Sequence, residues 1–175
     1  DLTGLRYFEE LEKRGFDVTY LEIPESGIIT EEALRAAVRP DTILVSIMFG
    51  NNEVGTVQPI AACGRFLREQ QIIFHTDAVQ VFAKSPIDVE AMQIDLLSAS
   101  SHKINGPKGV GLLYIRSAVK LAPQSYGGEQ ERKRRAGTEN VAGIVGFAEA
   151  VRLTAMEREE QVKQYQLLRH TLLER

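Results

Sequence analysis

Apolar side chains recur at α-helical spacing in four parts of the chain. In the first, Leu5, Phe8 and Leu11 lie on one helical face, and Gly15 is suited to end the helix. Thr30 is a typical N-cap residue for the second, with two glutamates in the first turn. The predicted helices span about residues 2–15, 30–40, 60–71 and 140–175, with Pro40 ending the second and a charge-rich stretch near Ala155 breaking the last.

Strand patterns separate these helices. Residues 17–23, "DVTYLEI", alternate between polar and apolar side chains, as a strand with one buried face does. Residues 42–49, "TILVSIMF", form a continuous apolar run that predicts a strand buried on both faces. Three further strands are predicted at residues 72–76, 94–100 and 110–115. Strands that alternate with helices predict an α/β fold, in which helices cover a parallel or mixed sheet.

Composition and charge narrow the choice of function. Of the 175 residues, 43% are apolar and 26% are charged, which is typical of a globular domain with a sizeable core. The net charge of −3 argues against nucleic acid or an anionic membrane as a partner. Residues 131–135, "ERKRR", fit a solvated loop better than a nucleic-acid patch. The longest apolar runs are too short to span a bilayer, and the single cysteine favours a reducing, cytoplasmic compartment.

Both ends of the sequence lie within helical patterns. The chain opens without a methionine or a charged-then-apolar leader, and it closes without a helix cap. We therefore expect a fragment of a longer protein.

Polar residues gather where the predicted strands end. In sheets of this class, ligands bind beyond the carboxyl ends of the strands. Three segments follow strands, "FGNNE" at 49–53, "HTDAVQ" at 75–80 and "SSHK" at 100–103, and "GPKG" at 106–109 precedes the last strand. Lys103 therefore stands where the sheet stops and a loop begins.

Each of these segments also has a purely structural explanation. Asp77 is suited to cap a helix or close a turn, and Asn51 and Asn52 are suited to a turn after a strand. His75 and Asp77 share a strand face and suggest a metal pair, but no third ligand has a fitting spacing, so we predict no metal site. Residues 106–111, "GPKGVG", lack the pattern of a phosphate-binding or dinucleotide-binding loop.

Taken together, the segments fit one chemistry. A lysine at one strand end, a carboxylate at a neighbouring one, and surrounding amide, hydroxyl and imidazole groups are the components of a pyridoxal phosphate (PLP) site. The Lys103 amine would hold the cofactor aldehyde as a Schiff base. The Asp77 carboxylate would keep the pyridine nitrogen protonated, which makes the ring an electron sink.

Four segments, taken in order along the chain, resemble the class V aminotransferase family. They are "NNEVGTVQPI", "HTDAVQ", "SSHKINGPKGVG" and "RAGTENVAGIVG", and they are most similar to the cysteine desulfurases of iron–sulfur cluster assembly. The resemblance implies the type I PLP fold, with residues 1–175 forming the central and later part of the large PLP-binding domain. The small domain would be absent, although its first residues could lie in the terminal helix.

The resemblance also implies a role for individual residues. Lys103 resembles the Schiff-base lysine, which moves a proton between the substrate and the cofactor, and Asp77 resembles the partner of the pyridinium. The remaining cofactor contacts that the resemblance implies are the ring-oxygen ligands Asn52 and Gln80, the phosphate ligands Ser100 and His102, and Thr138, which would reach the phosphate of the other subunit of a homodimer.

Several family features are missing from this sequence. A phosphate loop with a threonine and a ring-stacking histidine would precede it, and an arginine for the substrate carboxylate and a persulfide-forming cysteine would follow it. Cys63 is no substitute, because Ile60, Cys63 and Leu67 share the apolar stripe of a helix and predict a core cysteine. Glu129 and Lys133 stand where the family more often has glycine.

The resemblance therefore implies a PLP-dependent cysteine desulfurase that takes sulfur from L-cysteine as an enzyme persulfide and releases L-alanine. Its implied partners are a second copy of the chain and a sulfur-acceptor or scaffold protein. We expect the chain by itself to be inactive. Two alternatives stay open: another class V enzyme, such as an aminotransferase or a selenocysteine lyase, and a truncated binding module without catalysis.

Overall fold

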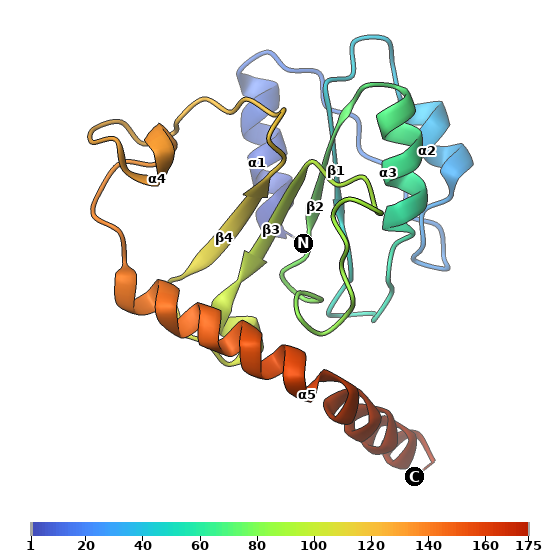
Figure 1. The fold of residues 1–175 in the computed structure, drawn as a ribbon. Coiled ribbons are helices and arrows are strands. Elements are labelled where there is room, and N and C mark those ends of the chain that lie inside the picture. The colour runs from blue at the N-terminus through green and yellow to red at the C-terminus, as the bar shows by residue number, and fades with distance from the viewer. Residues whose placement is uncertain (1, 175) are drawn as a thin grey trace. The chain divides into compact units, whose positions relative to one another are not determined.

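The chain divides into two units, residues 1–42 and 43–175. The computed structural model describes residues 2–174, whose elements are labelled in Figure 1. In the first unit, α1 (Leu2–Lys13) ends as its sequence predicts: Gly15 has φ +88°, and Phe16 N donates to Leu11 O at 3.1 Å. In α2 (Glu31–Ala37), Thr30 Oγ1 accepts from Ala33 N at 3.1 Å, so the predicted cap is confirmed.

The strand predicted for residues 17–23 is wrong. This segment forms no strand. Tyr20 instead stands edge-on to Phe8, with ring centroids 6.4 Å apart, and its hydroxyl donates to Glu12 Oε2 at 3.3 Å. A strand requires a hydrogen-bonded neighbour, and the described residues of this unit form only helices and loops. The alternation of polar and apolar residues indicated a tendency to form a strand, but it did not show whether a second strand would lie beside it.

The second unit is built on a four-stranded sheet in the order β1-β2-β3-β4. Its strands are β1 (Leu44–Met48), β2 (Ile73–Asp77), β3 (Leu96–Ser100) and β4 (Gly111–Ile115). The first three are parallel to one another, and β4 is antiparallel to β3. Its helical elements are α3 (Ile60–Glu69), the 3₁₀ turn η1 (Ser101–Ile104), α4 (Gln130–Lys133) and α5 (Val141–Leu173). The α/β class and the mixed, mostly parallel sheet are therefore confirmed.

Helix α3 packs against β2 and supplies much of the core. Its apolar stripe is buried, with Ile60 and Cys63 at 2% exposure and Leu67 fully buried. Phe74 of β2 and Leu97 of β3 are buried with it. The prediction of a core cysteine is thus confirmed, and the thiol lies inside the core.

The strand predicted at residues 42–49 is present, but the prediction that both of its faces are buried is wrong. β1 is an edge strand of the sheet, and Ile43 and Leu44 are 67% and 42% exposed. An uninterrupted apolar run reports hydrophobicity, and it cannot tell an edge strand from a central one.

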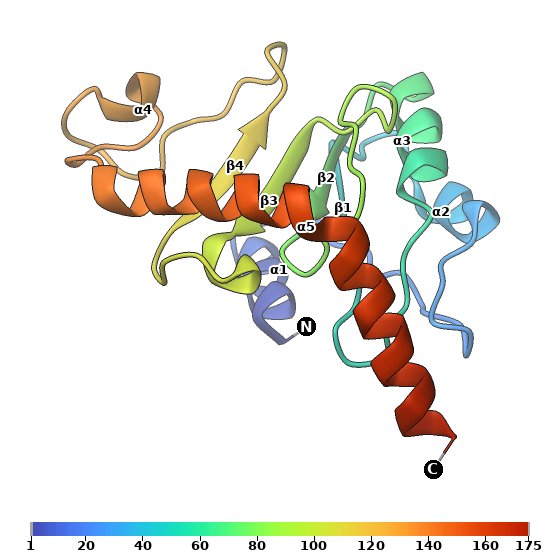
Figure 2. The ribbon, with the colours of Figure 1, turned by 60° about the horizontal axis from the view of Figure 1, so that its bottom comes forward.

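The prediction of a helix break near Ala155 is also wrong, because α5 is one helix of 33 residues that continues through this position. The helix changes direction part-way along (Figure 2). Its first half carries the buried residues Phe147, Ala150 and Thr154, whereas the second half is mostly exposed. Charged residues are good helix formers, so a charge-rich stretch alters which faces are buried without ending the helix.

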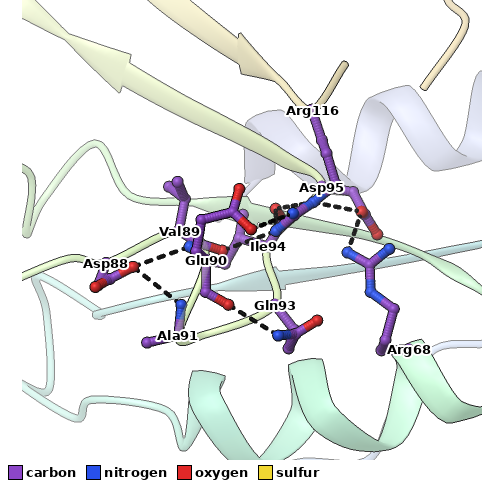
Figure 3. Close-up of polar contacts among 9 residues, drawn as sticks. All are labelled: Arg68, Asp88, Val89, Glu90, Ala91, Gln93, Ile94, Asp95 and Arg116. Atoms are coloured by element: carbon purple, nitrogen blue, oxygen red, sulfur yellow. Dashed lines mark hydrogen bonds and ion pairs between the residues drawn. The ribbon is translucent and has the colours of Figure 1, made fainter. Parts of the chain in front are cut away.

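A buried carboxylate joins the elements at the amino ends of β2 and β3. Asp95 is 4% exposed, and its Oδ2 accepts from Phe74 N at 3.0 Å. Its Oδ1 lies 2.6 Å from Arg68 Nη2 of α3 and 3.1 Å from Arg116 Nε, beyond β4 (Figure 3). Arg116 also bonds to Glu90 at 2.6 Å. One side chain therefore fixes a helix and three strands at this edge.

We predict that Asp95→Asn lowers the free energy of unfolding by about 2 kcal/mol or more, because the two guanidinium groups lose their buried counter-charge. The matched control is Glu90→Gln, the same chemical change at a carboxylate that is 69% exposed. It should cost less than about 1 kcal/mol. Urea unfolding followed by circular dichroism measures both, and equal effects would contradict the assignment.

Candidate active site

One face of the sheet carries a group of polar side chains. The strand register places Ser46, His75, Asp77, Ser98 and Ser100 on this face. All five are exposed or half-buried, whereas the alternating residues of the opposite face, such as Phe74 and Leu97, are buried. The chemistry-bearing residues of the sheet therefore share its open face.

Lys103 lies directly beyond the carboxyl end of β3. It is part of η1, which begins after Ser100 and ends at Asn105, a residue with a left-handed φ of +63°. The predicted loop is thus one turn of 3₁₀ helix. Gly106 follows, and a Cβ there would come within 2.2 Å of Ser101 Oγ and 3.1 Å of Ala150 Cβ in α5. Close packing of η1 against α5 fixes the backbone that carries the Lys103 amine.

Asp77 ends β2 at the same edge of the sheet, since β2 and β3 are parallel. One carboxylate oxygen, Oδ1, accepts from Val79 N at 2.9 Å. The turn role that the sequence suggested is therefore real. It employs one oxygen atom, and a carboxylate has two, so the turn and a ligand can be served together.

Ser100 and His102 flank the approach to the lysine. Ser100 Oγ lies 2.7 Å from His102 Nδ1, so the two side chains form a linked pair. Nδ1 is engaged by the hydroxyl, and Nε2 is left as the outer ring nitrogen. One hydrogen of this pair is used in the mutual bond, and the other, on Nε2 or on the hydroxyl according to the imidazole tautomer, can be donated to a phosphate.

The remaining sheet-edge residues lie in the turns after β1 and β2. Asn51 Oδ1 accepts from Glu53 N at 2.8 Å and from Val54 N at 3.0 Å, so Asn51 builds the first turn and Asn52 follows it on the surface. Gln80 is half-buried in the second turn, three residues beyond Asp77. Both amides belong to the edge at which Lys103 stands.

Thr138 lies elsewhere in the fold, in the loop between α4 and α5, and Figure 1 shows α4 well away from the end of the sheet that η1 adjoins. Within the preceding α4, Glu131, Arg132 and Lys133 have φ of +49°, +57° and +65°. Positive φ is costly for side chains of this kind, so the segment differs from an ordinary helix turn. The structure does not bring Thr138 together with the strand-end residues.

Lys84, which follows the turn after β2, is a candidate site residue that the sequence pattern did not indicate. Burial lowers the pKa of Lys84, and the positive charge of Lys103 lowers it further. The charge of Lys103 thus acts on Lys84, and two lysines at this edge make it attractive to an anion. The lysine lies 19 positions from Lys103 in the sequence, and only the return of the chain along β3 brings the two together.

Sequence analysis also missed the setting of His75. Its Nδ1 lies 2.7 Å from Ser46 Oγ and its Nε2 lies 2.9 Å from Ser98 Oγ. Burial lowers the pKa of His75, and the negative charge of Asp77 offsets part of that effect. The signal was present as single polar residues within apolar strands, but only the register shows that they meet.

Among residues 2–174, the structure brings together no group of three or more His, Cys, Asp or Glu side chains that could hold a metal ion. No helix of this part of the chain has the length and apolar character needed to cross a membrane.

Comparison with known proteins places these residues in a family context. The profile of the aminotransferase class-V family matches residues 5–175. Cysteine desulfurase IscS of Methanosarcina thermophila is 55% identical over 94% of the chain, and the chain spans 41% of that relative. A solved NifS-like protein superposes with a TM-score of 0.94 at 42% identity, covering 97% of this chain and 47% of its own. DndA from Streptomyces lividans gives 0.90 at 41% identity, covering 97% and 49%.

We predict that His75 makes the protein less stable in acid. Its folded pKa lies below the unfolded value of about 6.5, so below that pH the unfolded state binds a proton that the native state does not. The free energy of unfolding should therefore decline as the pH falls from about 7.5 to about 5.5. His75→Gln should show a shallower decline in urea unfolding than the parent chain. Equal slopes would contradict the prediction.

Proposed function

The chain belongs to the aminotransferase class-V family, and from this premise we propose that the whole protein is a PLP-dependent cysteine desulfurase. The observation that carries the proposal is the β3–η1 junction, where Lys103 follows the linked pair Ser100 and His102. Asp77 ends the neighbouring parallel strand. The names of the relatives favour desulfurases within the family. The chain spans about 41% of these relatives, so the activity is proposed for the whole protein.

The donor set fits PLP. The cofactor requires an amine for its aldehyde, an anion for its ring nitrogen and donors for its phosphate. Lys103 provides the amine, Asp77 provides the carboxylate, and the Ser100–His102 pair provides a hydrogen-bond donor for the phosphate. Lys84 adds positive charge at the same edge. Asn52 and Gln80 provide amides that can donate to the ring oxygen.

The residues of this chain would divide the work as follows. PLP would supply an electron sink for the substrate Cα, and Asp77 would support it by holding the proton on the ring nitrogen. With substrate bound, the Lys103 Nζ would accept the proton from Cα and return a proton later in the cycle. In the net reaction, a protein thiol and L-cysteine give a protein persulfide and L-alanine. Cys63 is 2% exposed in the core, so the thiol belongs to another part of the whole protein.

We further propose that the whole protein is a cytoplasmic homodimer that supplies sulfur for iron–sulfur cluster assembly through an acceptor or scaffold protein. Thr138 lies in the loop between α4 and α5. The family resemblance implies that a threonine in this loop reaches the phosphate of a second copy, so the site would be shared. Residues 1–175 would then form the central and later part of the large domain.

Borohydride reduction of the whole protein with bound PLP tests the proposal. The cofactor should become covalently fixed to the peptide that contains Lys103, as detected by mass spectrometry. Lys103→Ala should lose this label, and it should lose the release of sulfide from L-cysteine that is measured with dithiothreitol added to reduce the persulfide. Lys108→Ala is the matched control, because Lys108 is an exposed lysine in the same segment, and it should keep both. Fixation at Lys108 or Lys84 would overturn the assignment.

A further inference from the structure

Three polar side chains form a continuous row across the open face of the sheet. The row runs from Ser46 of β1 through His75 of β2 to Ser98 of β3, with contacts of 2.7 Å and 2.9 Å to the two ring nitrogens. Ser46 interrupts an otherwise apolar strand sequence, and His75 and Ser98 each follow two apolar residues of their strands. Because each strand of the parallel part contributes one member, the row ties all three strands together on the face that carries Asp77.

The row ends beside Asp77. Ser98 is the register partner of Asp77, so the bond from His75 to Ser98 runs diagonally toward the carboxyl edge. The backbone on either side is also fixed: Phe49 N donates to Asp77 O at 2.8 Å, and Ala78 N donates to Ser98 O at 3.0 Å. The backbone bonds set the position of the Asp77 main chain, and the side-chain row sets the surface beneath its carboxylate.

We propose that His75 is a positioning residue for Asp77, acting through its hydrogen bonds to Ser46 and Ser98. The proposal rests on the proposed function, since it concerns how Asp77 meets the cofactor ring. His75 does not itself need to touch substrate or cofactor. Its role is to hold β1, β2 and β3 in one arrangement, so that the free side of the carboxylate faces the ring nitrogen.

Charge supports this role. Among the described residues, the groups that act on the imidazole are the Ser46 hydroxyl from β1, the Ser98 hydroxyl from β3 and the Asp77 carboxylate from its own strand. A neutral imidazole has one donor and one acceptor nitrogen, and two hydroxyls can satisfy both. Burial favours this neutral form. A charged imidazole would compete with the ring nitrogen for the negative charge of Asp77, whereas a neutral one leaves that charge to the cofactor.

The experiment compares three variants of the whole protein loaded with ring-¹⁵N-labelled PLP. His75→Ala removes both bonds of the row, and His75→Gln keeps a neutral side chain with a donor and an acceptor. Thr76→Val is the matched control. The Thr76 hydroxyl donates to Ile47 O at 2.9 Å, so it links β2 to β1 on the opposite, buried face of the sheet. The readouts are the ¹⁵N shift of the ring nitrogen against pH, the kcat/KM for sulfide release and the melting temperature.

We expect His75→Ala to lower the apparent pKa of the ring nitrogen by about one unit. It should also lower kcat/KM by about tenfold or more, since a misplaced group can cost up to about 100-fold. His75→Gln should restore the ring-nitrogen pKa and bring kcat/KM to within about threefold of the parent. Thr76→Val should lower the melting temperature and leave the ring nitrogen unchanged.

Two results would overturn the inference. In the first, His75→Ala lowers only the melting temperature, as Thr76→Val does, which makes His75 a purely structural residue. In the second, His75→Gln is as impaired as His75→Ala, which means that the imidazole has a chemical role of its own. In both cases the proposed function still stands if the parent protein binds PLP and releases sulfide. A parent protein that does neither would reject the proposed function first.

Discussion

The buried carboxylate of Asp95 is the constraint on which the sheet depends. It lies where β2 and β3 begin, accepts a backbone hydrogen bond from β2 and pairs with arginines from α3 and from beyond β4. A buried charge of this kind is tolerated only when its partners are in place, so it penalises any other register of these elements. Once the amino ends of the strands are fixed, the pleat determines which side chains emerge at the carboxyl ends. The polar residues at the carboxyl edge therefore gain their positions from an interaction at the opposite edge.

The structural role of Asp77 on the open face is compatible with the chemical role that we propose for it. Asp77 closes a turn with one carboxylate oxygen, and this turn alone would explain an aspartate at position 77. The same turn fixes the side chain at the end of β2, beside the row of Ser46, His75 and Ser98. A carboxylate held in this way loses little entropy when it meets a ligand. The turn therefore helps to preorganise the candidate site.

Sequence patterns predicted most of the helices and strands of the second unit, because each of these segments carries its own periodicity and end signals. They failed where the outcome depends on a distant neighbour. Residues 17–23 alternate like a strand but have no partner in their unit, and residues 42–49 form an edge strand whose exposure depends on the sheet order. The motif residues could be picked out from strand ends and family resemblance. The meeting of His75 with two serines, and of Lys84 with Lys103, required the register and the return path of the chain.

The central claim is that Lys103 and Asp77 serve one PLP molecule at the carboxyl edge of this sheet. A crystal structure of the whole protein grown with PLP tests it most directly. The account predicts continuous electron density from Lys103 Nζ to the aldehyde carbon of the cofactor, with an Asp77 carboxylate oxygen about 2.8 Å from the ring nitrogen. Density that joins the cofactor to a different lysine, or a different acidic residue at the ring nitrogen, would contradict it.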